Sequence, residues 1–355
     1  MTIGGKAADQ EGTVRRPRGV LVIVVVALVL LVSMTVAVGV GPLSLTPSEV
    51  LRSLAVGVGL ADHGDIPPSQ AAVVWDVRLP RVLLAAMVGA CLAIAGAALQ
   101  GLFGNSLADA GVIGVTSGAS LGAICSIVLG LQFFGQWTVP AAAFVAGLLT
   151  TSLIYTLAKP GRKGGTVQIL LVGIAVTAVA GSINGFFTYI ASTTALEAIT
   201  FWSMGSLNRA SWESLSAGVL FFLAGAILLL FLAKPLDVLA LGERQAQHVG
   251  LHVKRVRLLL VVATSLVVGA AVALAGSIGF VGLVVPHIVR LAVGPVHRWL
   301  LPISALGGAL MIVLADIGAR TLNPPSEIPI GLFTGVVGGP FFLWLLSRRR
   351  TEMRA

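Results

Sequence analysis

The chain is poor in charge, in aromatic residues and in cysteine. Asp, Glu, Lys and Arg make up 10% of its 355 residues, and Phe, Trp and Tyr make up 6%. Soluble domains carry about 25% charged residues, so this composition excludes a water-soluble enzyme of one or two domains. The two cysteines, Cys91 and Cys125, lie inside apolar runs. We expect them to act as small hydrophobic residues rather than as a disulfide or a metal site.

Apolar residues dominate the remainder, at 57% of the chain, with a mean hydropathy of +1.00. A helix crosses the ~30 Å hydrocarbon core of a bilayer in about 20 residues. Apolar runs of this kind recur along nearly the whole chain. We therefore predict an all-α, polytopic membrane protein of about ten transmembrane helices. The predicted spans are residues 19–40, 81–100, 111–130, 137–158, 166–190, 212–233, 257–275, 279–294, 299–319 and 329–347.

The basic residues indicate how these spans are oriented, because cytoplasmic loops are enriched in Lys and Arg. With the N-terminus inside the cell and ten crossings, all but five of the 23 Lys and Arg residues are cytoplasmic. We therefore expect both termini in the cytoplasm, and we interpret the net charge of +9 as a topology signal rather than a nucleic-acid site. The five external basic residues are Arg52, Arg78, Arg81, Arg209 and Arg320.

The predicted spans contain almost no ionisable groups. Transporters driven by ion gradients usually place carboxylates or histidines inside the bilayer. Here Asp316 is the main exception, and we expect it to pair with Arg320 one helical turn later. The chain also lacks a catalytic constellation and a P-loop of the form G-x-x-x-x-G-K-[ST]. A gradient-driven secondary transporter and a membrane enzyme are thus the weaker alternatives, and any ATPase must be another polypeptide.

Small residues recur at helix-packing intervals in three of the spans. Lipid tails provide no hydrophobic drive between helices, so stripes of small residues allow helix backbones to approach closely. We predict a tightly packed bundle. The stripes are Ala85, Gly89, Ala93 and Ala97; Gly114, Gly118 and Gly122; and Gly331, Gly335 and Gly339.

Residues 234–257 differ from the spans, because they are polar and fall on the predicted cytoplasmic side. Their apolar residues can form one face of short helices that break at Gly242 and Gly250. Two interpretations remain open from the residues alone. The segment is either a docking element for a soluble partner or a solvated loop.

Six segments in sequence order carry a resemblance to a known family. They are RLPR at 78–81, AGAALQGLFGNSLADAGVIGVTSGASLGA at 95–123, ALGERQAQHVGL at 240–251, ALAGSIGFVGLVVPHIVRL at 273–291, HRWLLPISALGGALMIVLADIGAR at 297–320 and EIPIGLFTGVVGGPFFLWLL at 327–346. Through these segments the chain resembles, over nearly its whole length, the iron-chelate, haem and cobalamin (FecCD-type) permease subunits of bacterial ABC importers.

The resemblance implies a type II ABC importer permease fold and a homodimer with the translocation path at its interface. It implies two ATPase subunits on the cytoplasmic side and an extracytoplasmic substrate-binding protein. The chain itself would be no enzyme and would hold no permanent cofactor, since ATP acts through the partner ATPase. It would consist of a cytoplasmic tail (1–18), one permease domain in the cytoplasmic membrane (19–347) and a second cytoplasmic tail (348–355).

The resemblance also assigns roles to single residues. The segment at 240–251 matches the coupling helices that fit into a cleft of the ATPase. The residues expected to couple there are Leu241, Gly242, Glu243, Ala246 and Gly250. Outward-facing arginines in this family pair with acidic residues of the binding protein, and their counterparts are Arg78, Arg81 and Arg320. The alternatives are anchoring of these arginines in the headgroup layer and, for Arg320, pairing with Asp316.

The resemblance leaves the substrate open. Haem and ferric siderophores are equally favoured, with cobalamin as the alternative. The residues expected at the translocation path or its loop are Asn105, Asp109, Ser117 and Gly118.

The family commonly has N-P-L-A-(D/E)-P in this loop, whereas here both prolines are replaced, which leaves the loop less constrained. An external histidine, His63, is a candidate for a passing contact with haem iron.

Overall fold

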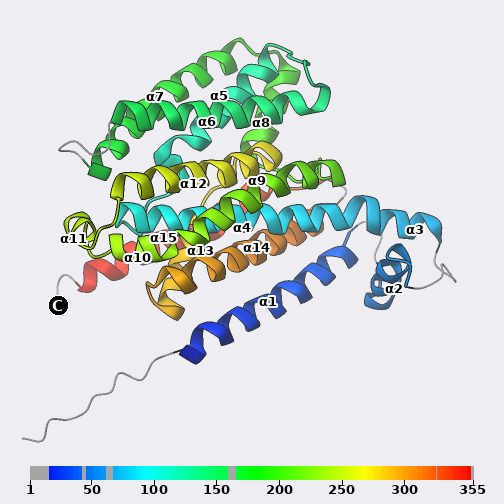
Figure 1. Ribbon diagram of the computed structural model, residues 1–355. Coiled ribbons are helices and arrows are strands. Elements are labelled where there is room, and N and C mark those ends of the chain that lie inside the picture. Colours follow the sequence, from blue (N-terminus) through cyan, green and yellow to red (C-terminus); the bar gives the residue numbers. More distant parts are fainter. Residues whose placement is uncertain (1–15, 42–44, 61–66, 159–164, 325, 353–355) are drawn as a thin grey trace, which may run out of the picture.

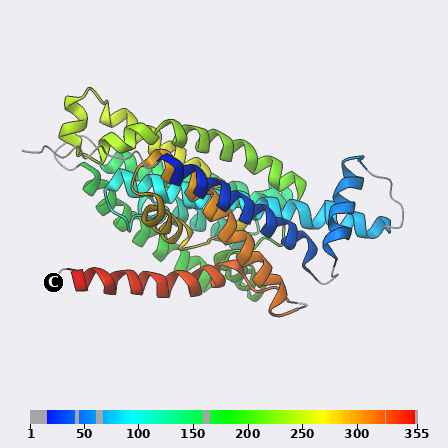
Figure 2. The same cartoon turned by 90° about the horizontal axis from the view of Figure 1, so that it is seen from below.

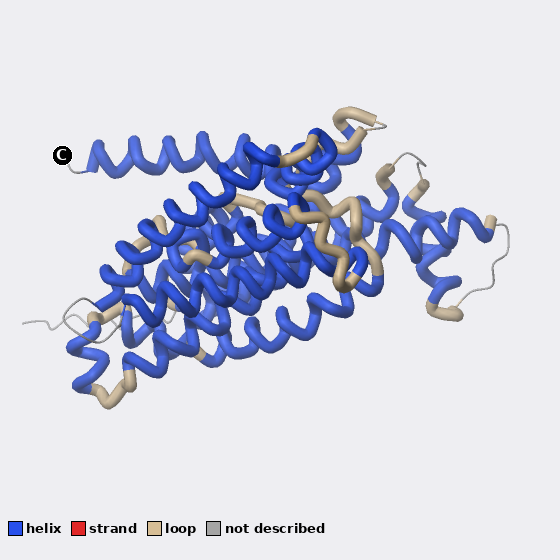
Figure 3. Tube along the Cα trace, turned by 90° about the horizontal axis from the view of Figure 1, so that it is seen from above, coloured by secondary structure: helices blue, strands red, loops and turns tan. Residues whose placement is uncertain are grey.

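The computed structural model describes residues 16–41, 45–60, 67–158, 165–324 and 326–352, and within these ranges it contains helices and loops but no strand (Figures 1 and 3). This confirms the all-α prediction. The helices are α1 (Arg16–Gly39), α2 (Pro47–Gly57), α3 (Pro68–Ala72), α4 (Leu79–Phe103), α5 (Val115–Val128), α6 (Thr138–Ala158), α7 (Gly165–Ile190), α8 (Thr193–Met204), α9 (Trp212–Phe231), α10 (Ala233–Leu239), α11 (Glu243–His248), α12 (Val253–Ala275), α13 (Val281–Val293), α14 (His297–Thr321) and α15 (Ile330–Glu352).

An apolar helix lies at each of the ten predicted spans. Seven of the described helices are long and apolar enough to cross a membrane: α1, α4 together with the turns before it, α6, α7, α9, α12 and α14. The other three, α5, α13 and the apolar part of α15, are shorter. At 1.5 Å per residue, the 14 residues of α5 and the 13 of α13 cover only part of a ~30 Å core.

Helix α4 lies at the centre of the bundle, where α12, α13 and α14 pack around it (Figure 1). Glycines set the closest approaches. A Cβ atom placed on Gly89 would lie 2.1 Å from the carbonyl oxygen of Gly308, and one on Gly96 would lie 2.1 Å from that of Gly282. Close contact of helix backbones therefore holds α4 against α14 and α13. The predicted small-residue stripe includes Gly89, at the contact with α14, but not Gly96, at the contact with α13.

The helical structure is interrupted between α12 and α13, in the glycine-rich stretch of residues 276–280. Gly276 adopts a φ of +72°. Phe280 has a φ of +68°, which is uncommon for a side chain larger than Asn. A Cβ atom at Gly338 of α15 would lie 2.3 Å from the Cβ atom of Phe280. The close contact between Phe280 and α15 thus helps to fix the conformation of residues 276–280.

Short helices cover one end of the bundle, and the hydropathy pattern did not predict them. Helix α2 begins with a capping box in which the Thr46 hydroxyl accepts from the N–H of Glu49, while the Glu49 carboxylate accepts from the N–H of Thr46. The indole rings of Trp75 and Trp212 stack with centroids 6.3 Å apart and join the turn before α4 to α9. Helix α8 likewise lies outside the predicted spans, and Ser192 caps its first turn.

The two ends of the bundle carry different structures (Figures 1 and 2). We use "outer end" for the end with α2 and α3, and "inner end" for the end with α10, α11 and the last turn of α15. These names follow the predicted orientation, which places residues 234–257 in the cytoplasm. Much of the basic charge behind that orientation, including the cluster at 159–163, lies outside the described residues.

Candidate functional site

At the outer end, the RLPR sequence forms an irregular helical turn. Pro80 has no N–H, so the carbonyl of Asp76 cannot receive the usual i→i−4 hydrogen bond. Residues Val73–Arg78 form a π-helical turn instead, and the N–H of Leu79 donates to the carbonyl oxygen of Val74, five residues earlier. This turn sets the directions in which Arg78 and Arg81 leave the backbone.

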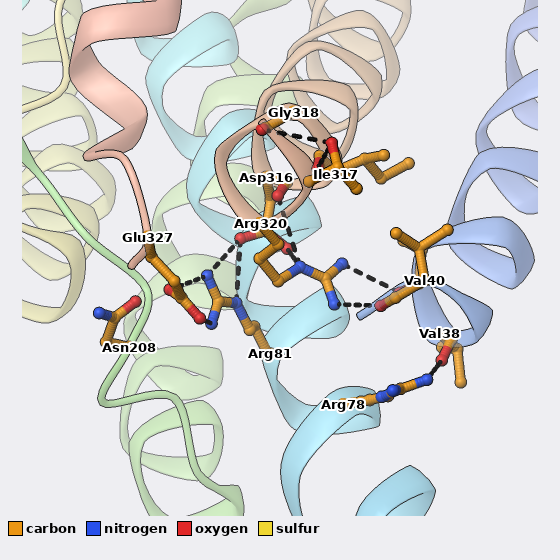
Figure 4. A network of polar contacts seen from close by, with 12 residues as sticks. Val38, Val40, Arg78, Arg81, Asn208, Asp316, Ile317, Gly318, Arg320 and Glu327 are labelled. Atoms are coloured by element: carbon orange, nitrogen blue, oxygen red, sulfur yellow. Dashed lines mark hydrogen bonds and ion pairs between the residues drawn. The ribbon is translucent and has the colours of Figure 1, made fainter. Parts of the chain in front are cut away.

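Arg81 lies between two carboxylates (Figure 4). Its Nε and Nη2 atoms donate to Oδ1 of Asp316 at 3.0 and 2.9 Å, and Nη1 and Nη2 donate to the two oxygens of Glu327 at 2.8 Å each. Asp316 is fully buried. Paired, charge-assisted bonds of this kind are among the strongest side-chain contacts, and they join α4 to α14 and to the start of α15.

Arg78 and Arg320 both reach the C-terminal end of α1. Arg78 donates to the carbonyl oxygens of Val38 and Gly39 at 2.9 and 3.0 Å. Arg320 donates to those of Ala37 and Val40 at 2.9 Å each. The last carbonyls of a helix lack intrahelical partners and carry partial negative charge, so two guanidinium groups are a favourable cap for them.

These three arginines are therefore directed into the protein. Their exposed fractions are 4% for Arg78 and 8% for each of Arg81 and Arg320. The predicted pair within α14 is present, with Nε of Arg320 3.1 Å from Oδ2 of Asp316. The bond from Arg81 to Glu327 was not predicted, because these residues lie 246 positions apart and nothing local in the sequence connects them.

At the inner end, an ion pair and the hydrogen bonds between a carboxylate and a histidine hold residues 234–257 against the bundle. Glu243, the first residue of α11, forms an ion pair with Arg257 of α12, whose side chain is almost completely buried. Oδ1 of Asp237 lies 2.7 Å from Nδ1 of His297 and accepts the backbone N–H of the same residue at 2.8 Å. The segment is therefore a structured element rather than a solvated loop.

The same segment leaves apolar side chains uncovered. Leu241 and Val249 are 71% and 72% exposed, whereas Ala246 between them is fully buried. Gly242 and Gly250 have φ values of +111° and +84°, which larger residues rarely adopt, so the helix breaks predicted at these glycines are confirmed. Thus α11 is fixed on one side and presents an apolar edge on the other.

The predicted path residues lie at α5 and the loop before it. The Asn105 side chain accepts the N–H of Leu107 at 2.9 Å, which stabilises the loop without the two prolines. Burial raises the pKa of the Asp109 carboxyl above its ordinary value. The Ser117 hydroxyl lies 3.2 Å from that of Thr177 on α7, and Gly118 is buried where α5 packs closely on α6.

Metal-binding groups do not gather in the part of the chain that the structure describes. Among those residues, no three His, Cys, Asp or Glu side chains lie close enough to hold a metal ion. Cys91 is buried, Cys125 is partly buried and neither forms a disulfide. His63 lies outside the described residues.

A bundle of ten apolar helices, with an ion network at one end and a structured polar segment at the other, defines a multi-pass membrane permease. The chain belongs to the FecCD transport family, whose family model matches residues 27–348. Members of this family are the membrane subunits of ABC importers and are not enzymes themselves, because the ATPase is a separate subunit.

Relatives and a solved structure agree with this assignment. The chain is 43% identical to the hemin transport system permease protein HmuU of Yersinia pestis over 283 residues, which is 79% of this chain and 84% of the relative. It is 41% identical to the cobalamin import permease BtuC of Halobacterium salinarum over 82% of this chain and 77% of the relative. An ABC transporter described as of metal-chelate type, in an inward-facing conformation, superposes with a TM-score of 0.81 at 32% identity, covering 92% of this chain and 99% of its own.

Proposed function

We propose that this chain is the permease of an ABC importer that carries haem or a ferric siderophore across the cytoplasmic membrane into the cell. It works as a homodimer, with two ATPase subunits at the inner end and a substrate-binding protein at the outer end. Both tails, residues 1–18 and 348–355, are cytoplasmic, and residues 19–347 form one permease domain. The chain holds no permanent cofactor.

The observation that carries ATP-driven transport is the apolar edge of the inner segment. Leu241 and Val249 are exposed on either side of α11, which the Glu243–Arg257 ion pair fixes to the bundle. Apolar side chains displayed on a polar, structured segment favour contact with another protein. We assign Leu241, Gly242, Glu243, Ala246 and Gly250 to coupling with the ATPase, with the glycines shaping the segment and Ala246 packing it down.

The homodimer is supported by helix faces that have no partner within the chain. A Cβ atom at Gly181 or Gly185 of α7, or at Gly335 or Gly339 of α15, would meet no atom within 4 Å. By contrast, one at Gly89 in the bundle centre would collide with α14. Small residues in membrane helices favour helix–helix contact, so we assign the open faces of α7 and α15 to the second subunit and the path between subunits. Helix α5, which packs on α7, carries Ser117 and Gly118, and the loop before it carries Asn105 and Asp109. We therefore assign these four residues to the path and its loop.

Binding-protein docking is assigned to the outer end, with Arg78, Arg81 and Arg320 as its predicted contacts. The three side chains lie close to that end, but each guanidinium group already has acceptors in the protein. Direct pairing with an acidic partner requires them to leave these acceptors. Reversal of each arginine to Glu tests this role when the capture of the loaded binding protein is compared with the melting temperature of the variant. Capture that falls further than the loss of folded protein explains would support docking, and unchanged capture by all three variants would leave these arginines as structural groups.

The choice of substrate rests on similarity. The relative from Yersinia pestis is named for hemin, while several others, among them that of Vibrio cholerae at 43% identity, are named for vitamin B12. The experiment is uptake of radiolabelled haemin, a panel of ferric siderophores and cyanocobalamin in a strain that lacks this gene. Loss of haemin uptake or of one siderophore class supports the proposal. Loss of cyanocobalamin uptake alone would replace it with the cobalamin alternative.

A further inference from the structure

A cavity of about 420 Å³ lies near the outer end of the bundle, between the start of α6, the second half of α8 and the last residues of α12. This volume falls within the range of about 300–1,000 Å³ that is usual for small-molecule sites. None of the contacts described above for the arginine network or the inner segment uses it.

The cavity has aromatic walls and a polar rim. Trp137, Phe201 and Trp202 line it, together with Asn208 and Arg209 of the loop between α8 and α9. Arg209 is exposed, and within the described residues no hydrogen bond or ion pair engages its guanidinium group. Arg209 therefore differs from the three buried arginines in being available to a ligand. Asn208 lies beside Glu327 of the arginine network (Figure 4).

Backbone contacts hold the cavity open. The N–H of Ser206 donates to the carbonyl of Ala275 at 2.8 Å, and that of Ser277 donates to the carbonyl of Trp202 at 3.3 Å. A Cβ atom on Gly276 would lie 2.2 Å from the same Trp202 oxygen. The end of α8 is thus joined directly to the break after α12, so the aromatic wall is not on a free loop.

We propose that this cavity is a substrate subsite at the outer mouth of the permease, for an anionic chelate with a flat apolar face. The aromatic walls take the apolar face, and the Arg209 guanidinium pairs with a carboxylate of the ligand. An iron porphyrin with two carboxylates has this chemistry, whereas cobalamin carries carboxamides around its ring in place of free carboxylates. The inference rests on the proposed function and narrows its substrate class. It also gives Arg209 a role that the docking arginines do not share.

The test uses the permease–ATPase complex in lipid nanodiscs, with haemin as the probe and quenching of tryptophan fluorescence as the readout. The substitution Arg209→Ala should raise the half-saturating haemin concentration by about threefold to fivefold, because a solvent-exposed ion pair contributes a free energy of this size. Added salt should reduce the difference between the variant and the wild type. Arg209→Lys should recover part of the loss. Arg52→Ala, at an exposed external arginine on α2, is the matched control and should bind as the wild type does.

A second ligand separates charge from apolar contact. Haemin dimethyl ester keeps the ring but has no carboxylate, so it should bind the wild type and Arg209→Ala alike. Ala198→Phe, which fills the cavity, should weaken both ligands. The subsite would be overturned if Arg209→Ala matched Arg52→Ala, or if the wild type bound haemin and its ester equally. Failure of the proposed function would give a different result from failure of the subsite. The wild-type complex would then show no ATP-dependent uptake of any iron chelate.

Discussion

At the scale of single residues, Arg81 bonds to two carboxylates of the outer ion network, Asp316 and Glu327. Its loss would leave Asp316 and Glu327 without their shared partner, and Asp316 is fully buried. Breaking a buried ion pair from one side costs about 3–5 kcal/mol. We therefore expect Arg81→Ala to lower the melting temperature strongly, and Arg81→Lys to recover little, because a lysine cannot form the two-pronged bonds.

The matched control for this prediction is Arg52→Ala. Arg52 is exposed on α2, and substitutions at such sites usually change stability by less than about 0.5 kcal/mol. Thermal unfolding in detergent, followed by fluorescence, compares the variants. Equal melting temperatures for Arg81→Ala and Arg52→Ala would mean that the network contributes nothing to stability.

Asp109 gives a prediction that depends on pH. Burial raises the pKa of its carboxyl, so the folded protein binds this proton more tightly than the unfolded chain does. Stability therefore decreases as pH rises from the unfolded pKa, about 3.9, through the higher folded value. Asp109→Asn removes this titration. It should raise the melting temperature at pH 7, with a smaller gain near pH 4, and equal changes at the two pH values would contradict the raised pKa of the Asp109 carboxyl.

At the scale of helices, the glycines of α4 and α15 predict opposite responses to the same substitution. Gly89→Ala places a Cβ atom against the backbone of α14, and overpacking of this kind costs about 1–3 kcal/mol. Gly335→Ala meets open space and improves helix propensity, so within one subunit it should be neutral or stabilising. If Gly335→Ala weakens association of two subunits while Gly89→Ala lowers the melting temperature, both assignments hold. Equal melting temperatures would contradict the packing at Gly89.

The inner segment predicts that Glu243 acts by positioning α11. Its partner, Arg257, is buried at the start of α12, so Glu243→Gln should release α11 and reduce the transport achieved per ATP hydrolysed. The exchange Glu243→Arg with Arg257→Glu restores an ion pair and should recover coupling. If the exchange fails while Arg257→Gln alone leaves coupling intact, Glu243 contacts the ATPase directly. Uptake and hydrolysis measured together in proteoliposomes distinguish these cases.

Much of this architecture could be predicted at the helix scale, because hydropathy and length identify membrane helices well. All ten predicted spans coincide with helices, and the helix breaks at Gly242 and Gly250 were predicted from these glycines. The contacts of the outer arginines were not anticipated. Arg81 and Asp316 lie 235 residues apart, so their pairing depends on how α4 packs on α14. Sequence alone identified only the pair within one helix, Asp316 with Arg320, since its spacing follows the helical period.

At the scale of the whole molecule, α12 joins the two functional ends. Its second turn holds Arg257, the partner of the inner segment, and its last residues line the outer cavity. Its 23 residues span about 34 Å at 1.5 Å per residue, comparable to the thickness of a bilayer core. In the proposed coupling to the ATPase, a movement of the inner segment can therefore be transmitted to the outer end through one helix that is buried along much of its length.

The central claim is that this permease imports its chelate with energy from ATP. The most direct measurement is uptake of iron-labelled haemin into proteoliposomes that contain the permease and its ATPase, with the loaded binding protein outside and ATP inside. We expect accumulation that requires ATP and the binding protein and is lost when the ATPase is omitted. Uptake driven by a proton or sodium gradient without ATP would contradict it and would restore the secondary transporter that the scarcity of charge in the spans argued against.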